Sequence, residues 1–193
     1  MLVDLQAPSR DNVFSTDDIA SSFAACGVTL DTPSPLPVVV AVGGTFDHLH
    51  DGHRRLLSAA HALARCLLDR GCKASVSVGV SESALTGNKS HSHHLEPWAV
   101  RAQSVSAYMA CLDDASSPVS CVPFPLHSAL GPVGTDAQIR YLVVSEETKG
   151  CVSMVDAARL SLSLPPCTVV SIPVVGAEGG GKLSSSDIRA ALE

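Results

Sequence analysis

The stretch that organises the chain is residues 38–53, VVVAVGGTFDHLHDGH. Its first five residues are apolar and mostly β-branched, and two glycines end the run, which predicts a strand buried on both faces. Leucines and alanines then recur at helical spacing from Gly52 to Asp69, and Gly71 follows as a glycine just past a helix often does. The stretch therefore reads as a strand, a glycine-containing turn and the start of a helix.

The same alternation of strand and helix continues downstream. The pattern predicts further strands at Lys73–Val80, Val119–Phe124, Ile139–Val144 and Cys167–Ile172, and further helices at Glu96–Leu112, Cys151–Leu162 and Ser184–Leu192. Strands that alternate with helices form parallel sheets covered on both faces. We therefore expect an α/β fold with a doubly wound, five-stranded parallel sheet of Rossmann-like type, whose ligands bind at the carboxyl ends of the strands.

Residues 1–36 differ in character from the rest of the chain. They are rich in Asp, Ser and Pro, and only Thr16 to Cys26 could form a short helix, with Ile19 and Phe23 on one face. We expect an N-terminal extension that packs without taking part in chemistry, followed by one domain over residues 37–193.

Composition excludes several classes of protein. The formal net charge is -6, which argues against broad nucleic-acid binding. The first residues lack a secretory signal pattern, and the longest apolar run is too short to cross a bilayer, so we expect no membrane partner. The seven cysteines are scattered and include no CxxC pair, which favours reduced thiols in a cytoplasmic protein.

The turn after the first strand carries side chains suited to phosphate. Gly43-Gly44 allows a ligand to approach the backbone, and Thr45 offers a hydroxyl group. His50 and His53 lie three residues apart at a helix start, whose free N–H groups also attract anions. His48 is expected to face away, and a zinc site made by the three histidines lacks a cysteine or further acid at ligand spacing.

The sequence resembles the HxGH nucleotidyltransferases and, among them, the phosphopantetheine adenylyltransferases of eukaryotic and archaeal type. The superfamily pattern G-x-F-D-x-x-H-x-G-H lies within Gly43–His53, and its later serine-rich motif corresponds to Lys182–Arg189, KLSSSDIR. The narrower resemblance rests on Tyr141–Thr148, YLVVSEET, and on Gly131–Asp136, GPVGTD. It extends from about Val38 to Leu192 and implies the Rossmann-like nucleotidyltransferase fold.

The resemblance also implies an activity and a set of site residues. The activity is transfer of AMP from ATP to 4′-phosphopantetheine, giving dephospho-CoA and pyrophosphate, with Mg²⁺ accompanying ATP and no metal ligand from the protein. The implied catalytic residues are His53, Lys89 and Thr45, and the implied acceptor-binding residues are Thr45, Lys89 and Arg101. The implied nucleotide-binding residues are Gly43, Gly44, Thr45, Phe46, His50, His53, Glu146, Ser184, Ser185 and Ser186.

Several alternatives stay open at this stage. Glu146 and Glu147 either hold ribose or adenine or cap the next turn, and Arg189 is either part of the serine motif's site or a surface charge. The histidines at 91, 93 and 94 are expected to lie in a solvated loop. The acceptor could instead be that of a cytidylyltransferase or a nicotinamide-nucleotide adenylyltransferase, and a nucleotide-binding protein without turnover is the third possibility.

Overall fold

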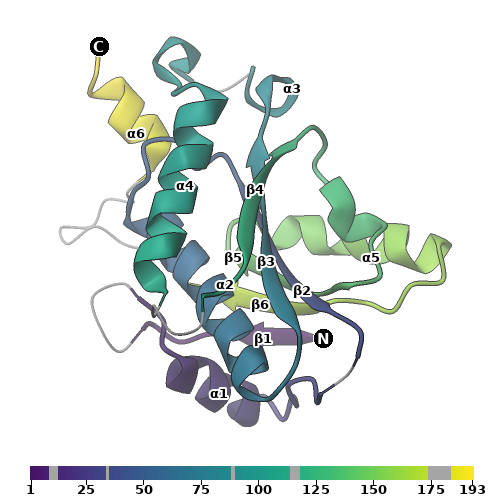
Figure 1. Ribbon diagram of the computed structural model, residues 1–193. Coiled ribbons are helices and arrows are strands. Elements are labelled where there is room, and N and C mark those ends of the chain that lie inside the picture. The colour runs from purple at the N-terminus through teal and green to yellow at the C-terminus, as the bar shows by residue number, and fades with distance from the viewer. Residues whose placement is uncertain (9–12, 34, 88–89, 114–117, 174–183) are drawn as a thin grey trace.

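Six parallel strands form one sheet in the order β1-β6-β5-β2-β3-β4 (Figure 1). The computed structural model describes residues 1–8, 13–33, 35–87, 90–113, 118–173 and 184–193. The strands are β1 (Leu2–Asp4), β2 (Val38–Gly44), β3 (Ala74–Ser81), β4 (Cys121–Leu126), β5 (Ile139–Ser145) and β6 (Thr168–Ile172). The predicted parallel α/β architecture is confirmed, but the predicted count of five strands is wrong.

The additional strand comes from the N-terminal extension. β1 pairs with β6 in register, with Val3 opposite Val170, and the Val3 side chain is buried. Three residues are too few to show a periodic pattern, so only the neighbouring strand defines this one. The extension therefore adds an edge to the sheet, beyond the helix that its sequence predicts.

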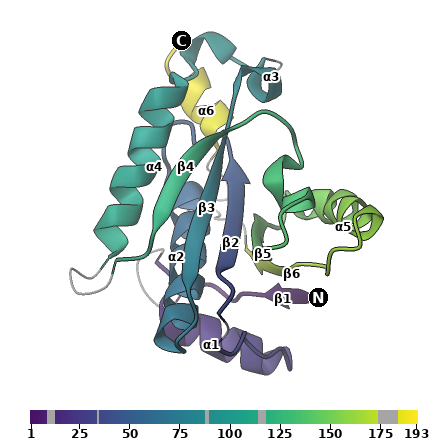
Figure 2. The ribbon, with the colours of Figure 1, turned by 45° about the vertical axis from the view of Figure 1, so that its right-hand side comes forward.

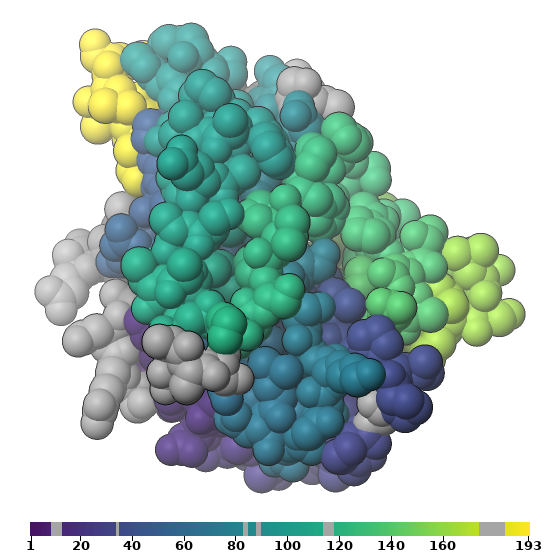
Figure 3. All heavy atoms as spheres, in the orientation of Figure 1, coloured from purple at the N-terminus to yellow at the C-terminus, as the bar shows by residue number. Residues whose placement is uncertain are grey.

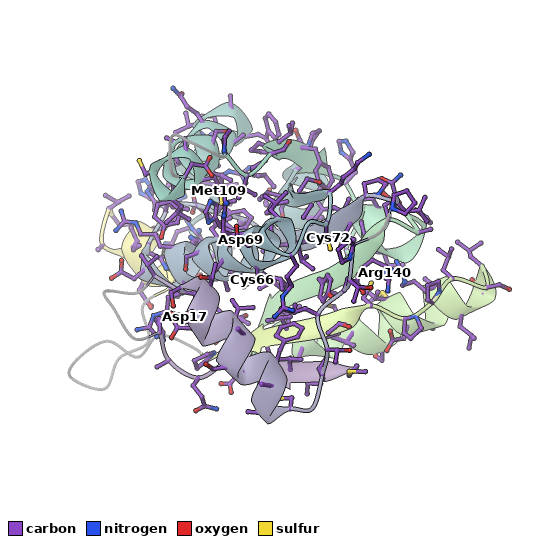
Figure 4. The ribbon with its side chains drawn as sticks, turned by 60° about the horizontal axis from the view of Figure 1, so that its bottom comes forward. Asp17, Cys66, Asp69, Cys72, Met109 and Arg140 are labelled. Atoms are coloured by element: carbon purple, nitrogen blue, oxygen red, sulfur yellow. The ribbon has the colours of Figure 1, made fainter. Side chains whose placement is uncertain are left out.

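That helix is α1 (Thr16–Ala25), and its own residues define its start. Ser15 and Asp18 form a capping box, in which each side chain accepts a hydrogen bond from the other residue's backbone N–H. Ile19 and Phe23 are buried, and the Cys66 thiol donates to the Thr16 carbonyl from the neighbouring helix. Figure 4 labels Cys66 on that helix and Asp17 on α1.

The remaining helices cover the two faces of the sheet unequally (Figure 2). The long helices α2 (Asp51–Asp69) and α4 (Trp98–Leu112) lie with α1 on one face, over the larger hydrophobic core. The other face carries α5 (Val152–Ser161) and the 3-10 helix η2 (Gly131–Gly134), over a smaller core. The short helices are α3 (Ser83–Thr86), α6 (Ser185–Ala190), and the 3-10 helices η1 (Ser92–His94) and η3 (Lys149–Cys151).

Strand order fixes where a ligand can enter. From β2 the chain builds outward through β3 to β4, and then crosses back to β5 and β6 on the other side of β2. The order therefore reverses between β2 and β5, and such switch points open a crevice at the carboxyl ends of the strands. β4 contains Pro123 and Pro125 and, among the described strands, pairs with β3 alone, as expected for an edge strand. Among the described helices, none is both long and apolar enough to cross a membrane.

Candidate active site

A cleft of about 400 Å³ opens where β2 and β5 end. Its walls come from the glycine-containing turn, the start of α2, the end of β5 and the serine motif that begins α6. The described residues that line it include Gly43, Gly44, Thr45, His50, Gly52, His53, Ser145, Glu147, Thr148, Ser184, Ser185, Ser186 and Arg189. Motifs that are far apart in the sequence thus meet around one space.

The turn that leads into the cleft has an unusual backbone. Phe46 and His48 both have positive φ, of 53° and 45°, which costs energy in residues other than glycine. The Phe46 side chain is fully buried, and a Cβ at Gly44 would lie 3.2 Å from its ring. Phe46 is predicted to bind the nucleotide. Its ring lies in the core next to Gly44, so only its backbone could contact a ligand.

His50 and His53 form a stacked pair at the start of α2. Their ring centroids are 3.9 Å apart with an interplanar angle of 26°, and the His53 ring also packs on Phe46. His50 is the N-cap of α2, and its Nδ1 accepts a hydrogen bond from the Gly52 N–H at 3.2 Å. A neutral His50 consequently carries its proton on Nε2, which lies 3.4 Å from Ser185 Oγ.

The ionisation of His50 follows from its surroundings. Burial lowers the pKa of His50 below 6.5, and the nearby carboxylates of Asp51 and Asp47 oppose this only in part. Gly52 contributes to the arrangement because a Cβ there would lie 3.0 Å from the His50 ring. The cleft therefore presents a neutral imidazole whose Nε2–H can donate to an anionic oxygen.

Beneath the cleft lies a buried ion pair between Asp47 and Arg189. The two side chains are 0% and 1% exposed, and Arg189 donates directly to Asp47 Oδ2. The other carboxylate oxygen, Oδ1, accepts from the Glu96 N–H at 2.9 Å. The alternative that Arg189 is a surface charge is therefore wrong, and Asp47, an invariable letter of the quoted motif pattern with no role assigned from the sequence, forms part of the site's framework.

The same pair anchors the serine motif. Ser185 Oγ donates to the Asp47 carbonyl at 3.0 Å, and Arg189 also donates to Ser186 Oγ and to the Ser90 carbonyl. Ser184 caps α6 and exchanges hydrogen bonds with Asp187. The three serines predicted to bind phosphate thus line the cleft, and Ser185 and Arg189 connect their helix to the first motif.

Two predicted site residues occupy other positions. Arg101, predicted to bind the acceptor, is 2% exposed and donates to the Thr45 carbonyl at 2.6 Å and to the Glu96 carbonyl at 2.9 Å. Burial lowers the pKa of Arg101, while the charges of Asp47 and nearby glutamates oppose that effect. Its guanidinium therefore supports the turn from behind rather than lining the cleft.

Glu146 is the second such residue. Its side chain is exposed, its backbone N–H donates to the Ile172 carbonyl, and Glu147 lines the cleft in its place. Lys89, predicted to be catalytic, lies outside the described residues, as do residues 174–183.

A second cavity, of about 290 Å³, adjoins the first. The two share Gly43, Gly44, Ser81 and Thr148. The second lies against the η2 face of the sheet and is lined by aliphatic side chains such as Leu126, Leu130, Val133, Val144 and Val155. None of its described lining residues is charged. No sequence pattern marks it, because its walls come from stretches that are far apart in the chain.

His48 lies apart from the other two histidines of the first motif. His48 Nε2 bonds the His94 carbonyl at 3.0 Å and its N–H donates to Glu96, so it points away from the stacked pair, as predicted. In the described part of the chain, the donor atoms placed closely enough to share a metal ion belong to His93, His94 and Glu193.

Comparison with known proteins agrees with this geometry. The cytidylyltransferase-like family model matches residues 41–191. The phosphopantetheine adenylyltransferase of Methanopyrus kandleri is 34% identical over 154 residues, which cover 80% of this chain and 90% of the relative. That of Pyrococcus furiosus is 32% identical over 154 residues, which cover 79% of this chain and 88% of the relative.

A eukaryotic relative and a solved structure complete the comparison. The phosphopantetheine adenylyltransferase of Saccharomyces cerevisiae is 33% identical over 159 residues, and the chain spans about half of its length, 48%. A crystal structure of a protein of unknown function from Archaeoglobus fulgidus superposes with a TM-score of 0.57 at 23% identity. It covers 76% of this chain and 99% of its own, which shows a shared fold.

Proposed function

Since this chain belongs to the cytidylyltransferase-like family and, within it, to the phosphopantetheine adenylyltransferases, we propose that it transfers AMP from ATP to 4′-phosphopantetheine. The products are dephospho-CoA and pyrophosphate, as a step in coenzyme A biosynthesis. The seven free thiols fit a reducing, cytoplasmic location.

The observation that carries this proposal is the pair of adjoining cavities. The polar cleft offers backbone N–H groups, hydroxyls and imidazoles, which suit a triphosphate. The apolar cavity meets it at Gly43-Gly44, so a chain-like acceptor could lie in one while its phosphate reaches the other. The uncharged aliphatic walls favour the pantetheine arm over choline, because choline is a cation that binds aromatic or anionic groups.

Adenylyl transfer requires the protein to position the two substrates and to stabilise the negative charge that develops on the phosphates. The acceptor phosphate is already ionised at neutral pH, so its oxygen attacks the α-phosphorus without a general base. The bond from the α-phosphorus to the β-bridging oxygen breaks, and pyrophosphate leaves with the electron pair. Such steps depend on in-line positioning and on donors aimed at the developing charge.

We assign the roles as follows. His50 Nε2–H and His53 donate to phosphate oxygens in the transition state, and Ser185 with Ser186 holds the β- and γ-phosphates. Thr45 and Lys89 bridge the α-phosphate and the acceptor phosphate. Mg²⁺ bound with ATP would neutralise phosphate charge, and it would need few ligands from the protein.

Pyrophosphate release with a panel of substrates tests the activity. The purified chain is incubated with ATP or CTP and with phosphopantetheine, phosphocholine or nicotinamide mononucleotide. We expect release with ATP and phosphopantetheine. Release only with CTP and phosphocholine, or only with ATP and nicotinamide mononucleotide, would assign another acceptor. Tight ATP binding with no release from any pair would identify a binding protein without turnover.

A cavity-filling variant tests the place of the acceptor. Leu130→Trp adds bulk to the apolar cavity and should raise KM for phosphopantetheine at least about tenfold, roughly 1.4 kcal/mol of binding, with KM for ATP unchanged. Leu160→Trp is the matched control, because Leu160 is 78% exposed on α5. Equal KM values for phosphopantetheine in the two variants would exclude the cavity as the acceptor site.

A further inference from the structure

Three histidines surround one carboxylate near the C-terminal end of the chain, and none of these four residues is among those that line the cleft. His93 and His94 belong to η1, and Glu193 follows α6, about 100 residues later in the chain. In Figure 3 the yellow C-terminal segment lies beside the teal segment that precedes α4. One ligand atom from each of His93, His94 and Glu193 lies within 4.8 Å of the other two.

This spacing is close to that of a bound metal ion. In a tetrahedral zinc site with bonds near 2.1 Å, ligand atoms are separated by about 3.4 Å. The separations here therefore have to shrink by at most about 1.4 Å, a distance that side-chain rotation can cover. His93 and Glu193 are exposed and His94 is half-buried, so the movement displaces no core packing.

A further residue holds the carboxylate in place. His91 Nδ1 lies 2.5 Å from Glu193 Oε1, and His93 Nε2 lies 3.7 Å from the same oxygen. These contacts place the carboxylate beside the imidazoles of both histidines. Ligating carboxylates in proteins are usually hydrogen-bonded in this way by a residue outside the coordination sphere.

We propose that His93, His94 and Glu193 bind a divalent transition metal ion, Zn²⁺ being the best match, with water completing the coordination. Two imidazole nitrogens and one carboxylate favour zinc, copper or nickel over calcium or magnesium, which take oxygen ligands. Three protein ligands leave a fourth coordination position open, and water can occupy it.

Such an ion would join two segments that flank the cleft. α6 carries Ser185 and Ser186, and it already contacts the other segment where Arg189 donates to the Ser90 carbonyl. The metal would add a second link at the far end of α6, at Glu193. We expect bound metal to raise the melting temperature by fixing α6 against this segment.

Titration of the full chain with Co²⁺ and Zn²⁺ tests the site, using protein that carries no polyhistidine tag and no nucleotide. Co²⁺ should give visible absorption bands of a four-coordinate ion at one equivalent, and Zn²⁺ should displace it. His94→Ala and Glu193→Gln should each weaken binding at least about tenfold, and His91→Gln by about 10–100-fold. His127→Ala is the control, because His127 is exposed and belongs to another segment.

The metal titration can fail or succeed independently of the assay for adenylyl transfer. Absence of Co²⁺ bands, or equal binding by wild type and the His93→Ala/His94→Ala double variant, would overturn the proposal. Because the ligands lie at the surface, these variants and the wild type should have the same melting temperature in the presence of a chelator. Lost metal binding would then not be caused by lost folding. Since the titration contains no substrate, its result does not depend on the proposed activity.

Discussion

Arg189→Met is expected to cost about 3–5 kcal/mol of folding stability, because it leaves the Asp47 carboxylate buried without its charged partner. Both side chains of the pair are almost fully inaccessible, at 1% and 0% exposure. After the substitution Asp47 Oδ1 still accepts from the Glu96 N–H, but Oδ2 loses the donor that Arg189 provides. For a chain of this size, the loss corresponds to a melting temperature lower by about 6–20 °C.

A double-mutant cycle separates the pair from the packing around it. Asp47→Asn combined with Arg189→Met removes both charges, so the double variant should be more stable than the sum of the single losses predicts. The coupling energy is expected to be about 2–3 kcal/mol. Urea unfolding followed by the fluorescence of Trp98, whose indole N–H donates to the Val80 carbonyl, gives all four stabilities.

The control is Arg54→Met. Arg54 and Asp51 form an ion pair at 3.2 Å, but their side chains are 48% and 41% exposed, and such a pair contributes at most about 1 kcal/mol. If Arg189→Met costs no more than Arg54→Met, or if the losses in the cycle are additive, then the buried pair does not hold α6 against the first motif. The contact of Ser185 with the Asp47 carbonyl would then need another support.

Three other outcomes follow from the same geometry. His53→Ala should lower kcat by roughly 10² or more with folding retained, because it removes a transition-state donor, and an unchanged kcat would remove His53 from the mechanism. Burial lowers the pKa of His50 below 6.5, so on acidification the unfolded chain takes up a proton at His50 before the fold does. Stability should therefore fall as the pH drops from 6.5 through the lowered pKa, and His50→Asn, which keeps a cap acceptor for Gly52, should flatten that slope in urea titrations at pH 7.5 and 5. An unchanged slope would point to another group. Burial raises the pKa of Cys66 to about 11, so alkylation of the native protein at pH 7.5 should label the exposed Cys26 and Cys111 well before Cys66, and equal labelling by peptide mass spectrometry would contradict the fold around α1.

The sequence alone predicts those elements whose structure depends on neighbouring residues. β2 and α2 follow from a run of apolar residues and from helical spacing, and the turn between them is contiguous. The N-cap role of His50 belongs to the same segment, yet a pattern of letters does not say which nitrogen carries the proton. That depends on the Gly52 N–H, which becomes visible only with coordinates.

Side chains whose partners are distant in sequence could not be assigned in this way. Asp47 and Arg189 are 142 residues apart. The sequence does not show that they are buried, because each is covered by parts of the chain that are distant in sequence. Arg101 shows a related difficulty, because the sequence places a cation near a predicted phosphate site but does not show which group the cation contacts. Its guanidinium donates to the Thr45 carbonyl, a backbone group of the same turn.

Gly44 shows why even a contiguous motif leaves the physical cause of its residues open. Lack of a side chain at Gly44 suits close approach of a phosphate, and this explanation needs only the sequence. The structure adds an independent cause, since the buried Phe46 ring would lie 3.2 Å from a Cβ at that position. The two causes predict different consequences for Gly44→Ala: the ligand explanation predicts weaker ATP binding by a stable fold, whereas the packing explanation predicts a lower melting temperature without any nucleotide. Because the same ring supports His53, displacement of Phe46 should also lower kcat, so a loss of stability and turnover together would identify packing as the dominant constraint.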